Sequence, residues 1–265
     1  MNQTSGLIEL SWIDLMLASA LVLVAIALSR WQRLGLTRGF LIGTVRAVVQ
    51  LVAVGYVLAF LFTTRRWYLV VLALLVMLVA ATKTATDRQR STRGSLFGIT
   101  GAAMLVGTGI TLAYVDAVVL RLHPWYDPQY AIPLFGMIVG NAMNGAALAA
   151  ERLTSEMELR RGEVEAYLAL GAAPSRAAAE PVRRALVAAL IPAVNGLMVV
   201  GLVALPGMMT GQILAGSSPN LAVRYQIVVA FMLAGAVAIT STAMVLWYRR
   251  RFFTAAEQLA TRTEV

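Results

Sequence analysis

The chain has 265 residues, of which 59% are hydrophobic and only 13% are charged, and its mean hydropathy is +0.75. A soluble domain carries about 25% charged residues, so the composition excludes a soluble globular protein and predicts an all-α, polytopic integral membrane protein. Cysteine is absent, which excludes disulfides and thiolate metal sites. The net charge of +9 would suit nucleic acid, but the placement of the basic residues indicates membrane topology instead.

Seven stretches are long and apolar enough to span a membrane, which takes about 20 residues for roughly 30 Å of hydrocarbon. No soluble domain has room between them, so residues 1–265 are expected to form one transmembrane domain. The N-terminus lacks the basic start of a cleaved signal peptide, so the first span is expected to be retained. The predicted spans are 12–29, 40–62, 67–81 (extending to Thr86), 97–119, 132–150, 185–205 and 222–248.

Most of the 22 Lys and Arg residues lie in four segments on one side of these spans, 30–38, 83–93, 152–184 and 249–262. Cytoplasmic loops of membrane proteins carry an excess of Lys and Arg. The sequence therefore predicts a multi-pass protein of the cell (inner) membrane, with the N-terminus outside and the C-terminus in the cytoplasm.

A polar segment, 152–184, interrupts the spans on the predicted cytoplasmic side. Ser155 and Glu158 fit a capping box at a helix start. A second short helix is expected after Gly162, and Gly171 suits its C-terminal end in the left-handed conformation. We therefore expect this segment to form short cytoplasmic helices between two spans.

The second of these helices is predicted to be amphipathic. Val164, Tyr167 and Leu168 follow the i, i+3, i+4 spacing of one helix face and make an apolar stripe on a polar helix. Such a stripe either docks into a groove of another protein or lies on the lipid headgroups. The residues alone leave both alternatives open.

Polar side chains inside the spans are costly, so they are candidates for function. Arg46 and Gln50 share a face of the second span, and Arg46 lies close enough to the cytoplasmic end for its side chain to reach the headgroups. Glu151, at the end of the fifth span, is a candidate partner for Arg46. Asn141 and Asn144 share a face of the fifth span. They either clamp a neighbouring helix or line a polar path.

The segment 205–216 is too apolar for a free loop and too rich in Gly and Pro for a plain helix. A re-entrant or broken segment buried in protein fits this composition. Met208 and Met209, with Met198, either bind a soft metal ion or serve as flexible packing.

No catalytic site is recognisable, so the chain is not expected to be an enzyme. His123, the only histidine, has no cluster of potential ligands around it. A glycine-rich phosphate loop that ends in Lys-Ser or Lys-Thr is also missing. We therefore expect no cofactor on this chain and no ATP hydrolysis by it alone.

Three blocks of sequence resemble the FetB-like permeases of ATP-binding cassette (ABC) transporters, and the resemblance covers nearly the full chain. The bacterial members of that family are linked to iron export and the plant members to aluminium tolerance. The middle block is also similar to the coupling loop of ABC importers, although the Ile-x-Leu-Pro ending of that loop is absent. The three blocks are 140–144, 165–172 and 205–216, the last followed by Tyr225-Gln226-Ile227.

The resemblance implies a membrane-spanning subunit that works as a homodimer in the lipid bilayer, with two separate ATPase subunits that hold the ATP and Mg²⁺. It implies iron or another metal species as substrate and export as the direction. Glu165, Ala166 and Gly171 match the coupling helix, to which the apolar stripe adds Tyr167 and Leu168. Our hypothesis for the translocation path uses the polar and thioether side chains at membrane depth: Gln50, Asn141, Met143, Asn144, Met208, Met209 and Gln212.

Two other classes of function remain open. An ion-coupled secondary transporter would need acidic residues or broken helices near the membrane midplane, but Asp14 and Asp116 lie near the outer ends of spans. The second class is a membrane protein that binds a partner through its cytoplasmic helix and transports nothing. Association with an ATPase distinguishes an ABC transporter subunit from both of these classes.

Overall fold

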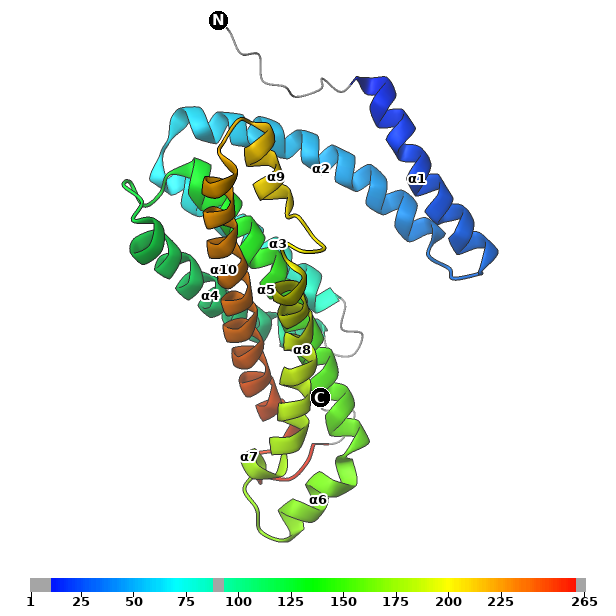
Figure 1. The fold of residues 1–265 in the computed structure, drawn as a ribbon. Coiled ribbons are helices and arrows are strands. Elements are labelled where there is room, and N and C mark those ends of the chain that lie inside the picture. The colour runs from blue at the N-terminus through cyan, green and yellow to red at the C-terminus, as the bar shows by residue number, and fades with distance from the viewer. Residues whose placement is uncertain (1–10, 88–92, 261–265) are drawn as a thin grey trace, which may run out of the picture.

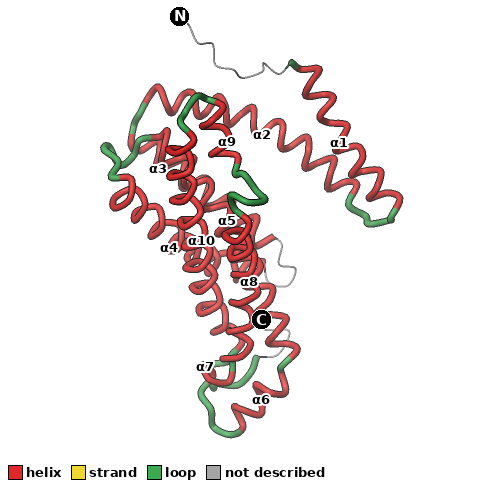
Figure 2. The backbone as a smooth tube through the Cα atoms, viewed as in Figure 1, coloured by secondary structure: helices red, strands yellow, loops and turns green. Residues whose placement is uncertain are grey.

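The computed structural model describes residues 11–87 and 93–260 of the chain, and Figures 1 and 2 show its path. This part of the chain is helical apart from turns and two isolated bridges, which confirms the predicted all-α class. Seven of the described helices are long and apolar enough to cross a membrane, as the sequence predicts. The chain is therefore a polytopic membrane protein.

Seven long helices are joined or extended by short ones. The long helices are α1 (Trp12–Trp31), α2 (Thr37–Thr64), α3 (Trp67–Asp87), α4 (Arg93–Tyr114), α5 (Pro128–Leu159), α8 (Ala179–Val199) and α10 (Pro219–Tyr248). The short ones are the π-helix η1 (Val115–Leu120), α6 (Arg161–Ala169), α7 (Pro174–Ala177), α9 (Gly207–Leu214) and the 3-10 helix η2 (Arg249–Phe252).

Helices α5 and α10 form the centre of a bundle, and α3, α4 and α8 pack around them. Figure 1 shows α6 and α7 at one end of this bundle, which we call the α6 end, and α9 at the opposite end, the α9 end. Helices α1 and α2 form a hairpin that leans away from the bundle (Figure 1). Only 6% of the most apolar window of each is buried, so lipid or another protein must cover this hairpin.

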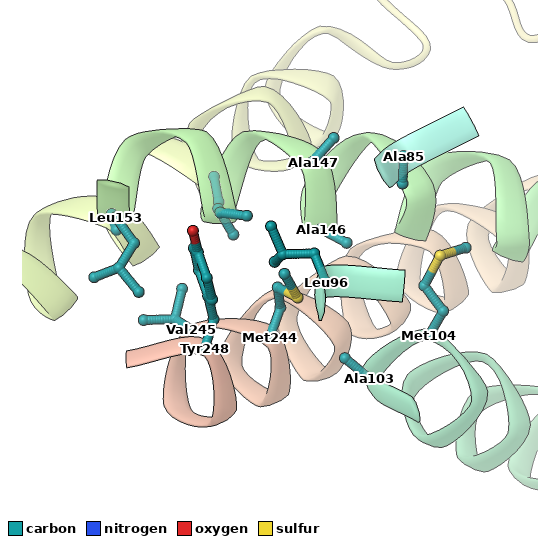
Figure 3. Packing of buried hydrophobic residues seen from close by; sticks show 14 of the residues in the cluster. Ala85, Leu96, Ala103, Met104, Ala146, Ala147, Leu153, Met244, Val245 and Tyr248 are labelled. Atoms are coloured by element: carbon teal, nitrogen blue, oxygen red, sulfur yellow. The ribbon is translucent and has the colours of Figure 1, made fainter. Parts of the chain in front are cut away.

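Small residues bring α10 close to its neighbours. A Cβ atom on Gly145 of α5 would lie 2.8 Å from Ser241 Oγ of α10, and one on Gly107 of α4 would overlap Thr240 of α10. Glycine at these two crossings therefore lets the helix backbones approach, as in other membrane bundles. Toward the α6 end, larger side chains such as Leu96 fill the core between the same helices (Figure 3).

Helix α5 continues beyond the predicted end of the fifth span at residue 150, and the predicted capping box is wrong. Ser155 and Glu158 lie within α5, which ends at Leu159, and not at a helix start. The helix continues because Leu153 and Met157, one turn apart, are buried in the core with 0% and 2% of their surface exposed.

The sixth span is shifted from the predicted range of 185–205. Helix α8 starts earlier, at Ala179, and ends at Val199, because the chain becomes extended and Gly201 adopts a φ of +84°. The N–H of Gly201 donates a hydrogen bond to the carbonyl of Ala204 (2.9 Å), which closes a tight turn. The segment 205–216 is broken as predicted, with the short helix α9 between this turn and α10, but the expected burial is not observed, because none of the residues of α9 is buried within the single chain.

Candidate functional site

The α6 end carries a short helix that stands outside the membrane-spanning bundle (Figure 1). The apolar stripe predicted on it divides between two faces. Val164 is fully buried and Leu168 is partly buried against the main core, whereas Tyr167 is 46% exposed. The inner face therefore attaches α6 to its own chain, and only the outer face is free for a partner.

The outer face combines apolar side chains with a tight turn. Glu165 and Ala166 are exposed beside Tyr167, and Leu170, just after the helix, is 85% exposed. Gly171 ends the turn with a φ of +84°, as predicted. Exposed apolar side chains that cap a protruding helix are typical of a protein interface. Leu168 packs α6 against its own chain and is not part of this exposed surface.

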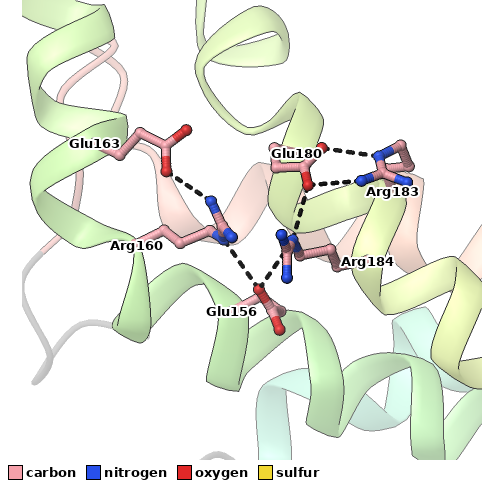
Figure 4. Close-up of polar contacts among 6 residues, drawn as sticks. All are labelled: Glu156, Arg160, Glu163, Glu180, Arg183 and Arg184. Carbon is pink, nitrogen blue, oxygen red and sulfur yellow. Dashed lines mark hydrogen bonds and ion pairs between the residues drawn. The ribbon is translucent and has the colours of Figure 1, made fainter.

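An ion-pair network connects α5, α6 and α8 at this end (Figure 4). Arg160 donates hydrogen bonds to Glu156 (3.2 Å) and Glu163 (2.7 Å). Arg184 of α8 lies 2.7 Å from Glu180 of the same helix and 4.0 Å from Glu156. Glu156 therefore faces guanidinium groups from two directions.

These ion pairs are partly or largely exposed, so solvent and salt screen them and each contributes little to stability. Desolvation lowers the pKa of Arg160, but its hydrogen bonds to Glu156 and Glu163 outweigh this effect and raise the pKa above its ordinary value. Through Arg160 the network joins the start of α6 to α5, and through Glu156 and Arg184 it joins α5 to α8.

The α9 end contains a cavity of about 320 Å³ between α5, α9 and α10. Met208 and Gln212, two of the predicted path residues, line it together with Tyr130 and Tyr225. The side-chain carbonyl oxygen of Gln212 is buried, and no hydrogen-bond partner for it is found among the described residues. A buried acceptor without a partner among these residues is unusual, which distinguishes Gln212 from the other residues that line the cavity.

The other predicted path residues lie outside this cavity. Asn141 is exposed on α5 and its amide donates to the carbonyl of Met137 (2.9 Å) of the same helix. Asn144 is exposed on the same face of α5, Gln50 is exposed on α2, and Met143 is partly buried against the main core. Within one chain, Met208 and Gln212 therefore line the same cavity, and the predicted path residues of α5 and α2 lie elsewhere. Met209 is partly buried on α9.

The expected pairing of Arg46 with Glu151 is not observed. Both side chains are exposed, and among the described residues no ion pair joins them. Arg46 lies on α2, in the hairpin that leans away from the bundle (Figure 1). The sequence indicated the depth of this arginine but not the separation of its helix from α5.

Two buried polar residues near the α9 end were not assigned a role from the sequence. Asp116 in η1 and Gln226 in α10 are 8% and 9% exposed. Each has one side-chain oxygen for which the described residues offer no hydrogen-bond partner. π-helical turns often occur at functional sites. The signal available in the sequence was an acid within an apolar stretch and a glutamine in the block that resembles FetB-like permeases.

The described residues contain no group of three or more His, Cys, Asp or Glu side chains that could hold a metal ion. Met198 is 71% exposed, on α8, and Met208 packs against the buried cluster around Val229. Met208 thus packs against this cluster and also lines the cavity between α5, α9 and α10, and metal binding by the methionines stays a prediction.

A family model matches residues 12–253, which is most of the chain and includes the seven long helices and the α6 end. It describes an uncharacterised protein family, UPF0014. The chain belongs to this family.

Relatives of this chain come from bacteria and plants. The probable iron export permease protein FetB of Escherichia coli is 37% identical over 246 residues, covering 93% of each chain. The rice membrane protein STAR2 is 44% identical over 243 residues, covering 91% of this chain and 84% of its own. The Arabidopsis protein ALUMINUM SENSITIVE 3 is 38% identical over 244 residues, covering 92% and 88%. No solved structure matches this chain.

Proposed function

We propose that this chain is the membrane-spanning subunit of an ABC transporter that exports iron or another metal species. A separate ATPase subunit supplies the energy and holds the ATP and Mg²⁺. One observation carries the proposal: a UPF0014 chain related to FetB has a short helix, α6, outside its membrane bundle, with Tyr167 and Leu170 exposed on it.

The geometry of the α6 end supports a coupling role. Helix α6 follows directly on α5, and Glu156 of α5 pairs both with Arg160 at the start of α6 and with Arg184 of α8. Nucleotide-dependent movement of an ATPase bound to Tyr167 would shift the central helix of the bundle. Alternating access then follows as a shift between two packings of the spans, biased by a partner that binds them unequally.

The orientation in this proposal places the α6 end in the cytoplasm of the cell (inner) membrane. Arginines are concentrated there, and a cytoplasmic location follows from their excess. The basic residues in the described part of this end are Arg152, Arg160, Arg161, Arg176, Arg183, Arg184, Arg249, Arg250 and Arg251. The α9 end, with the cavity lined by Gln212, would face the outside and receive the exported species.

A second copy of the chain completes the path in this proposal. Asn141, Asn144 and Glu151 are exposed on α5 at spacings that place them on one face of the helix. Amides and carboxylates at membrane depth face protein or a water-filled cavity and not lipid. A partner copy that covers this face gives these polar groups such surroundings.

Reconstitution into proteoliposomes tests the proposal. The chain is co-expressed with an ABC ATPase that co-purifies with it, and ATP-dependent movement of iron(II) is measured. Tyr167→Glu is expected to abolish ATPase association and transport, because it places a charge in an apolar contact, while Tyr167→Phe retains both. Transport driven by an ion gradient without ATP, or equal ATPase binding by Tyr167→Glu, would contradict the proposal.

A further inference from the structure

The described residues that follow α10 and η2 form an ordered segment. Residues 252–260, which we call the C-terminal loop, fold back on themselves. The N–H of Thr254 donates to the carbonyl of Gln258 (2.8 Å), and the N–H of Ala260 donates to the carbonyl of Phe252 (2.9 Å). These bonds close the loop as a short ordered turn.

The base of the C-terminal loop is attached to the two central helices. Phe252 and Ala260 are 6% and 7% exposed. The Phe252 ring meets the Tyr248 ring of α10 edge-on at 5.1 Å, and the Tyr248 hydroxyl is 3.2 Å from the hydroxyl of Thr154 on α5. Arg161 of α6 donates to the carbonyl of Ala260 (3.5 Å). These contacts join the base of the loop to α10 and α6, and they join α10 to α5.

The tip of the C-terminal loop, Ala255 to Gln258, is exposed and stands beside α6. An open cavity of about 520 Å³ lies between them, lined by Glu165, Leu168 and Gly171 on one side and by residues 256–259 on the other. A second cavity of about 420 Å³ lies between the tip and α7. Glu257 lines both cavities.

We propose that the C-terminal loop is a second docking element for the ATPase subunit, and that the first cavity receives a side chain of that subunit. This inference rests on the proposed function. The residues expected to couple to the ATPase, Glu165 and Gly171, form one wall of the cavity, and Ala256 and Gln258 form the other. A partner that fills the cavity touches both walls.

Charge at the rim indicates the chemistry of the ATPase side chain. Glu165 and Glu257 border the cavity. Glu165 is paired with Arg161 at 2.8 Å, whereas no ion pair of Glu257 is found in the described part of the chain. A Lys or Arg of the ATPase that enters between α6 and the tip would pair with Glu257.

The docking arrangement has a mechanical consequence. Helix α6 continues α5, and the C-terminal loop continues α10 through η2. An ATPase seated between them pushes on the ends of both central helices at once. Its movement then reaches α4 and α8 through their packing against α5 and α10.

Cysteine labelling tests this inference, because the natural chain contains no cysteine and each introduced thiol is unique. Three variants are made: Ala256→Cys in the loop, Ala166→Cys on α6, and Asp87→Cys at the exposed end of α3 as a control. Inside-out vesicles carry each variant with or without the co-purifying ABC ATPase, and the rate of reaction with a membrane-impermeant maleimide is measured.

The expected result is that the ATPase slows labelling at Ala166→Cys and Ala256→Cys several-fold and leaves Asp87→Cys unchanged. Protection at Ala166→Cys alone would overturn the role of the loop and leave the proposed function standing. If the ATPase slows labelling at none of the three positions, both the role of the loop and the proposed function are overturned. Glu257→Arg is expected to weaken ATPase binding about tenfold, which is about 1.4 kcal/mol, relative to Glu257→Gln; equal binding by the two would contradict the charge assignment.

Discussion

The substitution Gly107→Ala tests the close packing of α4 on α10. A Cβ at this position would lie 2.9 Å from both Cα and Cβ of Thr240 and closer still to its hydroxyl oxygen. Ordinary contacts between carbon atoms are about 3.5–4.0 Å. Because Cα belongs to the backbone, no change of the Thr240 rotamer relieves the clash, and the two helices must separate locally.

The cost of overpacking a core in this way is about 1–3 kcal/mol. Gly109→Ala is the matched control on the same helix, since no atom lies within 4 Å of a Cβ there, and alanine otherwise favours a helix by about 0.5–1 kcal/mol over glycine. Thermal unfolding in detergent is expected to give Gly107→Ala a Tm about 2–10 °C below that of Gly109→Ala. Equal Tm values would refute the packing at this crossing. Thr240→Ala is not expected to rescue Gly107→Ala, because Cα and Cβ of residue 240 remain.

Three further predictions concern the site. Gly171→Ala is expected to weaken ATPase association because φ at this position is +84°, a conformation that costs other residues about 1–2 kcal/mol. Gly162→Ala is the control in the same pull-down, since no atom lies near a Cβ at this position of α6. An equal loss of ATPase association in both variants would contradict the role of the Gly171 turn. Glu156→Gln removes the charge shared by two arginines; we expect a stability change under about 1 kcal/mol with a clear fall in permease-stimulated ATP hydrolysis, and unchanged stimulation would refute the transmission role. Asn144→Leu and Gln212→Leu are each expected to lower metal transport at normal expression, and unchanged transport in vesicles would remove these residues from the path.

The spans could be predicted because their length and apolarity are properties of the residues alone. The ends of the spans could not be predicted where tertiary contacts determine them. Leu153 and Met157 extend α5 by packing into the core, although the polar residues between them favoured a helix break. Gly201 ends α8 early by turning to positive φ, which its sequence neighbours, all apolar, did not indicate.

For the candidate site, the sequence predicted the short helix and its glycine terminus but not which face is free. The spacing of Val164 and Tyr167 indicates one stripe, yet the packing of α6 on the core buries the first and leaves the second exposed. The C-terminal loop was not predicted, because Phe252 and Leu259 show no periodicity and their burial depends on α5 and α10. Sequence patterns define faces, whereas neighbours from distant segments decide which face is covered.

The most direct test of the account is photo-crosslinking from position 167. A photoreactive phenylalanine analogue replaces Tyr167, which is exposed on α6, and native membranes that contain the assembled transporter are irradiated. The account predicts a covalent product between this chain and an ABC ATPase subunit. A product with lipid alone, or access of an impermeant reagent to position 167 from outside the cell, would contradict it.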